Sequence, residues 1–331
     1  MSILLGILLS LVVGGVSTAL YAWLVWWLDH YEKEPWYLLA LAFLWGALPA
    51  IVISLLVEVA LDLPISVMGQ GLAYDVASSS LLAPLIEEIT KGLFVFGVVI
   101  FVRREMDSVL DGIVYGAMVG LGFAFTENIL YFVGGLQEGG WQAWMMLVML
   151  RAIIFGLNHA FFTSLTGGAL GYARLSLNPT TQTLLPVLGL SAAVVFHGIH
   201  NLGATLNSVT CFAIIISLLS DWGGIIMVAV AIVLAWRQEK RWIETHLRSE
   251  VGTTFPHEVF ELAVSYRKRL SVQFQALLRG DFKAWRLSRR LAQTATDLAF
   301  KKHQLAELGE EGGAGPIIKE LRERLHALQS S

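Results

Sequence analysis

Two adjacent glutamates stand in the middle of an otherwise apolar stretch. The segment PLIEEITK places Glu87, Glu88 and Lys91 among hydrophobic side chains. Glu87 and Lys91 are four residues apart, so in a helix they share a face and can pair. Glu88 points about 100° away from that face and lacks this partner. A carboxylate in such surroundings is a candidate general base for activating water. The structural alternative is a buried ion-pair cluster that orients helices.

Polar side chains of related chemistry occur in three further apolar stretches. They are Glu127 in one, Arg151, Asn158 and His159 in the next, and His197, His200 and Asn201 in the last. In a helix, His197 and Asn201 share a face. Arg151 can neutralise nearby acids. Glutamate, histidine and asparagine side chains at one level can bind a metal ion, activate water or relay protons.

The stretches that carry these residues are expected to lie in lipid. Of the 331 residues, 56% are hydrophobic and 15% are charged, against about 25% charged in soluble domains. Charge is also segregated: residues 1–236 hold 6 Lys/Arg and 14 Asp/Glu, and residues 237–331 hold 17 and 12. The composition predicts an all-α, polytopic membrane helix bundle over 1–240 and a basic cytoplasmic helical tail over 241–331, with no nucleic-acid partner.

Seven segments are long enough to cross a bilayer, which takes about 20 apolar residues. They cover roughly 3–28, 37–60, 81–102, 109–133, 143–172, 183–206 and 211–236. The long fifth segment is expected to be tilted or broken. In the tail, apolar residues at helical spacing predict helices over 256–280, 281–309 and 317–328.

The distribution of positive charge predicts the orientation. Alternate loops contain Lys33, then Arg103 and Arg104, then Arg174, then Arg237, Lys240 and Arg241. The loops near 61–80, 134–142 and 207–210 contain no Lys or Arg. Because cytoplasmic loops are enriched in these residues, the N-terminus is expected outside and the tail in the cytoplasm.

This topology brings the polar groups to a similar depth. Glu87, Glu88 and Glu127 come about six or seven residues below the outer surface and His197 about nine, which agree within about 5 Å at a rise of about 1.5 Å per residue. His159 comes out deeper if its helix is straight. Ionisable groups at such depth usually face a polar interior and have a function.

The polar motifs together resemble those of the PrsW family of intramembrane proteases, within the superfamily of CAAX-processing and bacteriocin-immunity proteases. The resemblance covers about residues 20–240. The matching motifs are DHYEKEPW (29–36), EEITK (87–91), DGIVYG (111–116), GLGFAFTEN (120–128), NHAFFT (158–163) and HGIHN (197–201).

The resemblance implies a membrane-embedded peptidase, described as metal-dependent, in the plasma membrane of a prokaryote. It assigns catalytic roles to Glu87, Glu88, Glu127, His159, His197 and Asn201. The wider superfamily usually has His where this chain has Glu127. Glu127, His159 and His197 are expected to hold a divalent metal ion, with zinc as the candidate. In the metal-free alternative, Asn201 and a His stabilise the oxyanion.

The resulting hypothesis is proteolysis of a membrane-anchored protein at or just below the outer surface of the bilayer. Two alternatives use the same residues: an ion- or proton-coupled transporter, and a catalytically silent scaffold whose polar groups fix helix packing. A peptidase requires the acids and histidines to converge on one cavity, whereas a transporter requires them along a path to both sides. For a peptidase, each single Ala substitution of the two acids at 87 and 88, of Glu127, or of either histidine is expected to abolish cleavage and leave the fold intact.

Overall fold

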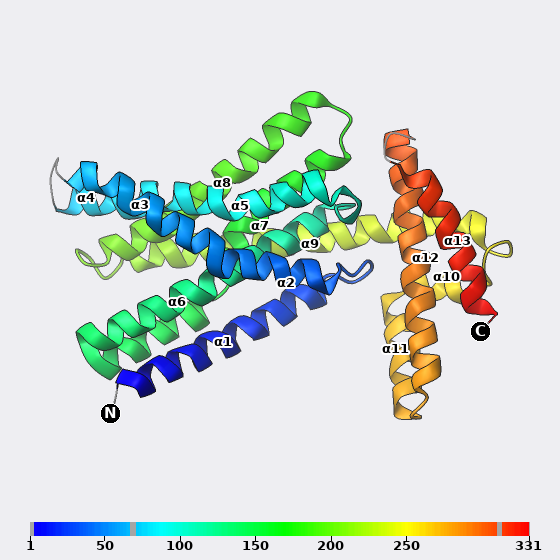
Figure 1. The fold of residues 1–331 in the computed structure, drawn as a ribbon, viewed down its shortest axis with the longest axis horizontal. Coiled ribbons are helices and arrows are strands. Elements are labelled where there is room, and N and C mark those ends of the chain that lie inside the picture. The colour runs from blue at the N-terminus through cyan, green and yellow to red at the C-terminus, as the bar shows by residue number, and fades with distance from the viewer. Residues whose placement is uncertain (1–2, 67–70, 310–312, 331) are drawn as a thin grey trace. The chain divides into compact units, whose positions relative to one another are not determined.

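The computed structural model describes residues 3–66, 71–309 and 313–330, and within these ranges the chain is helical with no strand (Figure 1). This confirms the all-α prediction. The chain forms two compact units. The second unit comprises Asp29–Lys33, Leu175–Leu177 and the chain from Ile232 onward, and the first comprises the other described residues.

The first unit is a bundle of apolar helices. Its helices are α1 (Ile3–Leu28), α2 (Trp36–Trp45), α3 (Ile51–Ser66), α4 (Leu72–Ala77), α5 (Ala83–Phe101), α6 (Val109–Leu147), α7 (Asn158–Leu175), α8 (Pro179–Leu206) and the first part of α9 (Ile214–Leu247). Three π-helical segments, Gly46–Ala50, Ser78–Leu82 and Val148–Ile154, extend α2, α4 and α6. A short 3₁₀ turn, Arg103–Glu105, follows α5.

Five helical stretches among the described residues are long and apolar enough to cross a membrane. They are Ile3–Leu28, Trp36–Leu61, Val109–Leu175, Pro179–Leu206 and Ile214–Glu250. The predicted third span corresponds to α5, which is not among these five stretches. Its two glutamates and its lysine make it less apolar. The chain is an integral membrane protein with a helical bundle, and the count of seven spans stays a prediction.

The long stretch from Val109 turns back on itself at Gly140. This glycine has φ 67° and ψ −159°, a backbone conformation that residues other than glycine rarely adopt. On either side of it the rings of Phe132 and Trp144 pack edge to face at 6.3 Å. The arm that follows is π-helical up to Ile154, and α7 begins only at Asn158. The expectation of a broken fifth segment is confirmed.

Glycines on α6 let α7 approach closely. A methyl group on Gly112, Gly116 or Gly120 would lie 2.0, 2.5 or 2.2 Å from the carbonyl oxygen of Gly167, Thr163 or His159, respectively. Successive contacts fall four residues apart on both helices and in opposite directions, which is antiparallel packing along a stripe of small residues. This packing fixes the backbone of His159 against Gly120.

Three motif residues outside the catalytic set, Glu34, Asp111 and Tyr115, make hydrogen bonds near the ends of helices. Ser108 and Asp111 form a capping box at the start of α6, with Ser108 Oγ accepting from Asp111 N at 3.2 Å and Asp111 Oδ2 accepting from Ser108 N at 2.7 Å. Tyr115 donates its hydroxyl hydrogen to Glu34, which precedes Pro35, the residue at the N-cap position of α2. The capping box fixes the start of α6, and the Tyr115–Glu34 bond links α6 to the residue that precedes the N-cap of α2.

The second unit has its own apolar core. It contains the end of α9, α10 (His257–Val264), α11 (Tyr266–Leu278), α12 (Phe282–Leu308) and α13 (Ala314–Gln329). Its buried residues include Ile243, Leu247, Phe255 and Leu298. Helices were predicted here, and the structure adds a break at Ser265 that separates α10 from α11.

A buried arginine ties the loop 29–33 into the second unit. Arg269 is 7% exposed, and its Nη1 donates to the carbonyl oxygen of Tyr31 at 3.1 Å. The ring of His30 stacks between Trp236 and Tyr266, at 4.0 and 4.2 Å. A buried guanidinium needs such acceptors because an unpaired buried charge is costly.

Candidate active site

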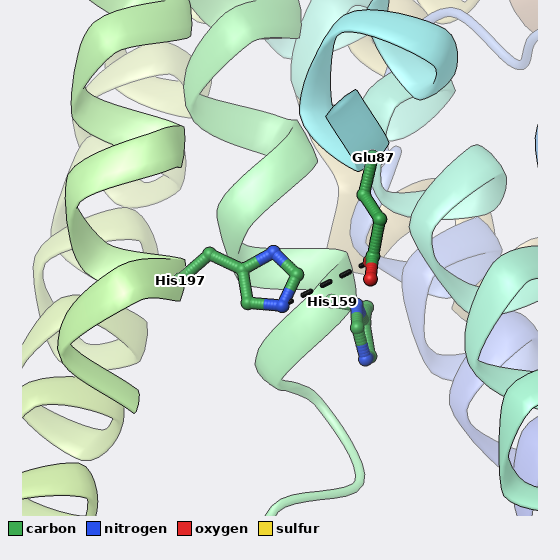
Figure 2. Close-up of side chains that lie close together, drawn as sticks. All are labelled: Glu87, His159 and His197. Atoms are coloured by element: carbon green, nitrogen blue, oxygen red, sulfur yellow. Dashed lines mark ion pairs between the residues drawn. The ribbon is translucent and has the colours of Figure 1, made fainter. Parts of the chain in front are cut away.

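Three side chains from three helices converge inside the first unit. Glu87 on α5, His159 on α7 and His197 on α8 are buried, and each offers one ligand atom within 4.8 Å of the other two. Figure 2 shows them directed toward one another. His197 Nε2 lies 3.9 Å from Glu87 Oε2. The α6–α7 packing and the break before Asn158 bring His159 to this level, which removes the depth misfit of a straight fifth helix.

Lys91 lies at the centre of the cluster. Its Nζ is 3.0 Å from Glu87 Oε2 and 2.9 Å from Glu88 Oε1, and 3.2 Å from His159 Nδ1. The expectation that Glu88 lacks this partner is therefore wrong. Positions three and four residues apart are both neighbours on a helix, and the long lysine side chain reaches both carboxylates.

Glu88 is the most enclosed of the acids. It is 0% exposed, and besides Lys91 it contacts His197 Nδ1 at 3.0 Å and accepts a hydrogen bond from Thr163 Oγ1 at 3.0 Å. Because an ionised carboxylate can only accept, we assign the proton of His197 to Nδ1, which leaves the lone pair on Nε2. Glu88 therefore orients His197 with Nε2 toward Glu87.

Glu127 joins the cluster from α6. Its Oε2 is 2.8 Å from His159 Nε2, and the same oxygen accepts a charge-assisted hydrogen bond from Arg151. Arg151 Nε also donates to Asn128 Oδ1 at 2.9 Å. The expectation that Arg151 neutralises a nearby acid is confirmed.

A cavity of about 730 Å³ reaches this cluster. Glu87, Glu127, Arg151 and His159 line it, together with Tyr131 and several apolar side chains. Lys91, like Glu88, is 0% exposed. Glu87 and Glu127 are thus the carboxylates of the cluster that a bound molecule could touch. His159 lines the cavity with them, whereas Glu88 and His197 are not among the lining residues.

Asn201 and His200 lie on the wall of the same cavity. Asn201 Nδ2 donates to the carbonyl oxygen of Ser79 at 2.8 Å, which leaves its second amide hydrogen for another acceptor. His200 Nδ1 is 2.7 Å from Asp221 Oδ2 on α9, and its Nε2 is 3.4 Å from Asn158 Nδ2. This pair stands beside the main cluster.

Two acids that stand in apolar spans near the cavity are absent from the residues predicted from the sequence. Asp221 is 1% exposed and holds His200. Glu58, on α3, lines the cavity, and its Oε1 is buried without a hydrogen-bond partner. Both stand in apolar spans, so the rule that identified Glu87 and Glu127 applies to them equally.

The donor set fits a divalent metal ion. One carboxylate and two imidazoles form a common catalytic zinc set, in which donors about 2.0–2.1 Å from the ion lie about 3.4 Å from one another. The separations here, up to 4.8 Å, require the side chains to close by up to about 1.4 Å. Binding through His159 Nδ1 also requires Lys91 to give up its 3.2 Å contact. Glu87 stands in this group where the sequence prediction had Glu127.

The close contact at Gly120 gives a first testable prediction. Gly120→Ala would place a methyl group 2.2 Å from the carbonyl oxygen of His159, and overpacking of this kind costs about 1–3 kcal/mol. We expect a lower melting temperature and impaired activity, because α7 must shift away from α6. Gly223→Ala on α9, with nothing within 4 Å, is the matched control. Equal melting temperatures and activities for the two variants would contradict the packing described.

Comparison with known proteins gives consistent matches. A family model described as PrsW family intramembrane metalloprotease matches residues 34–236. Protease PrsW of Oceanobacillus iheyensis is 30% identical over 201 residues, which cover 59% of this chain and 82% of that protein. Protease PrsW of Bacillus subtilis is 30% identical over 177 residues, covering 52% and 72%. Protease PrsW of Clostridioides difficile is 24% identical over 209 residues, covering 63% and 79%. No solved structure was found to match.

Proposed function

This chain belongs to the PrsW family of intramembrane metalloproteases, and we propose that Glu87, Glu127, His159 and His197 form its catalytic centre. It is an integral membrane hydrolase that acts on peptide bonds. The observation that supports this centre most directly is the convergence of Glu87, His159 and His197 at the edge of a cavity that Glu127 also lines.

Glu87, His159 and His197 would hold a divalent ion, with zinc as the proposed metal. When bound, such an ion polarises a carbonyl group and makes water a stronger nucleophile at neutral pH. The two imidazoles and the carboxylate suit zinc better than magnesium or calcium, which prefer oxygen ligands.

The remaining residues supply proton transfer, charge stabilisation and orientation. Glu127 faces the cavity and can accept a proton from the attacking water. Asn201 has an amide hydrogen available to donate to the developing oxyanion of the scissile carbonyl. Glu88 touches no bound molecule and acts by fixing the tautomer and orientation of His197. Arg151 holds Glu127 ionised and in place.

Family membership favours this function over the transporter and the silent scaffold considered from the sequence. The substrate is a peptide in the membrane. We propose, more narrowly, a membrane-anchored protein cut at or just below the outer surface. The cavity supports this proposal because its wall combines apolar side chains such as Leu55 and Leu130 with the polar cluster.

The same proposal includes the placement of the chain. The Lys/Arg pattern of the loops supports an N-terminus outside and a cytoplasmic tail from residue 241, in the plasma membrane of a prokaryote. The proposed domain boundary at 240/241 lies close to Ile232, where the second compact unit resumes.

Replacing Glu87 by glutamine tests the catalytic assignment. The change keeps the size of the side chain and leaves Lys91 its bond to Glu88, so the fold should persist. Cleavage should fall by at least about 10–100-fold, which is what loss of a ligand's supporting partner costs, because Glu87 is itself a proposed ligand. The measurement is a quantitative comparison of membrane proteomes between cells that produce the wild type and cells that produce the variant.

Glu138→Gln is the matched control, because Glu138 lines the same cavity but is not in the group of possible ligands. A membrane protein that accumulates uncut only with Glu87→Gln would identify the substrate. If Glu87→Gln and Glu138→Gln gave the same proteome as the wild type, Glu87 would have no catalytic role.

A further inference from the structure

The turn between α11 and α12 carries large apolar side chains on its surface. Leu270, Phe274, Leu277 and Leu278 fall on one side of α11 at intervals of four, three and one residues, and Phe282 begins α12. Phe274 is 61% exposed, Leu278 72% and Phe282 58%. We call these five residues the hairpin tip. Exposed apolar side chains gathered in this way mark an interaction surface.

The fold presents the hairpin tip as a fixed unit. Arg269 and Ala276, on the opposite side of α11, are buried, and α11 packs against α12. Gly280, with φ 70°, makes the turn, and Asp281 Oδ1 caps α12 by accepting from Ala284 N at 2.9 Å. Figure 1 shows α11 and α12 side by side and joined by this short turn. The apolar side chains are thus held outward by a buried opposite face.

Positive charge surrounds the hairpin tip. Residues 266–290 contain eight Lys/Arg and one Asp/Glu, which is the capping residue Asp281. Five of the basic side chains that lie on the surface are Arg267, Arg279, Lys283, Arg286 and Arg290. A helix with Phe and Leu on one side and Lys and Arg beside them is the pattern of segments that lie in the interface of a bilayer.

We propose that the hairpin tip docks onto a membrane surface rich in anionic phospholipid. The apolar side chains would enter the boundary between headgroups and acyl chains, and the surrounding guanidinium and ammonium groups would pair with lipid phosphates. Charge complementarity favours this partner, because the apolar tip alone would suit any hydrophobic surface whereas the basic rim selects an anionic one. The docking does not involve the catalytic residues, so its test is independent of the proposed function.

A fluorescent probe on the hairpin tip tests this docking in the full-length protein. Cys211 is the single cysteine and is exposed, so Cys211→Ser provides a background for Leu278→Cys labelled with an environment-sensitive dye. The labelled protein is reconstituted in vesicles of phosphatidylcholine, with or without phosphatidylglycerol. With phosphatidylglycerol, we expect a blue shift of the emission and several-fold stronger quenching by spin-labelled lipid. High salt should weaken both effects.

Two matched proteins complete the experiment. A label at Glu320→Cys, exposed on α13 of the same unit, should show neither effect. The combined variant Arg279→Gln, Lys283→Gln and Arg286→Gln, with the label at position 278, should lose the response while circular dichroism shows unchanged helix content.

Three results would overturn the proposal. They are equal emission in the two kinds of vesicle, a response that survives the charge substitutions, and a blue shift that depends on the protein-to-lipid ratio in neutral vesicles. The last result would assign the surface to a second copy of the chain.

Discussion

Replacing Glu88 by alanine is expected to lower the free energy of unfolding by about 3–5 kcal/mol. The side chain is completely buried and contacts Lys91, His197 and Thr163. Its removal leaves the Nδ1 hydrogen of His197 and the hydroxyl of Thr163 without their acceptor. Lys91 retains Glu87 as its one carboxylate partner. Activity should be lost as well, because His197 is no longer held with Nε2 toward Glu87.

The measurement is the melting temperature and the cleavage activity of the same purified protein. Glu88→Gln is the conservative control. Its amide oxygen still accepts hydrogen bonds, so this variant should be more stable than Glu88→Ala. It lacks the negative charge that faces Lys91, so it should remain less stable than the wild type. Glu138→Ala, at a cavity-lining position, should leave the melting temperature near that of the wild type. A melting temperature of Glu88→Ala equal to that of the wild type would show that Glu88 does not hold the cluster together.

This expected loss of stability differs from what the sequence alone suggests for the polar residues of the spans. From sequence alone, a polar group in lipid lowers the stability of the fold and is kept because catalysis needs it. Its removal should therefore leave the fold intact. We keep that expectation for Glu87, which lines the cavity. We expect the opposite for Glu88, because donors from α5, α7 and α8 surround its carboxylate. The distinction between two adjacent glutamates depends on their neighbours in space.

The sequence identified candidate residues of the proposed site because charges in apolar helices are conspicuous. Glu87, Glu127, His159 and His197 were identified in this way, and Arg151 was correctly expected to neutralise an acid. Their contacts could not be derived, since periodicity gives the face of a helix but not the reach of a side chain such as Lys91.

Pairing between distant segments was also beyond the sequence. The bond from Arg269 to the carbonyl oxygen of Tyr31 joins residues 238 positions apart. Hydropathy marked two separate spans around Gly140 but not the antiparallel register of α6 and α7. That register follows from glycines whose close contacts are with backbone atoms of the partner helix. The spacing of the glycines alone does not identify α7 as the helix that packs on α6.

Removal of divalent metal is expected to abolish cleavage, and return of zinc is expected to restore it. The physical basis is the donor set of Glu87, His159 and His197, whose ligand atoms lie within 4.8 Å of one another. Metal bound per chain should be measured together with activity, so that the site is tested independently of turnover. Activity that persists in protein free of metal would instead support the scheme in which a carboxylate and a histidine act without an ion.

Two variants distinguish the ligand set in the structure from the set predicted from the sequence. Glu87→Gln should lose the bound metal. Removal of a residue that merely supports a ligand lowers metal affinity by about 10–100-fold, and loss of the ligand itself should cost at least as much. Glu127→Gln should lose activity but retain the metal, because Glu127 contacts His159 and Arg151 and is not in the group of three. The reverse pattern, with metal lost from Glu127→Gln and kept by Glu87→Gln, would restore Glu127 as the ligand and leave Glu87 as the base.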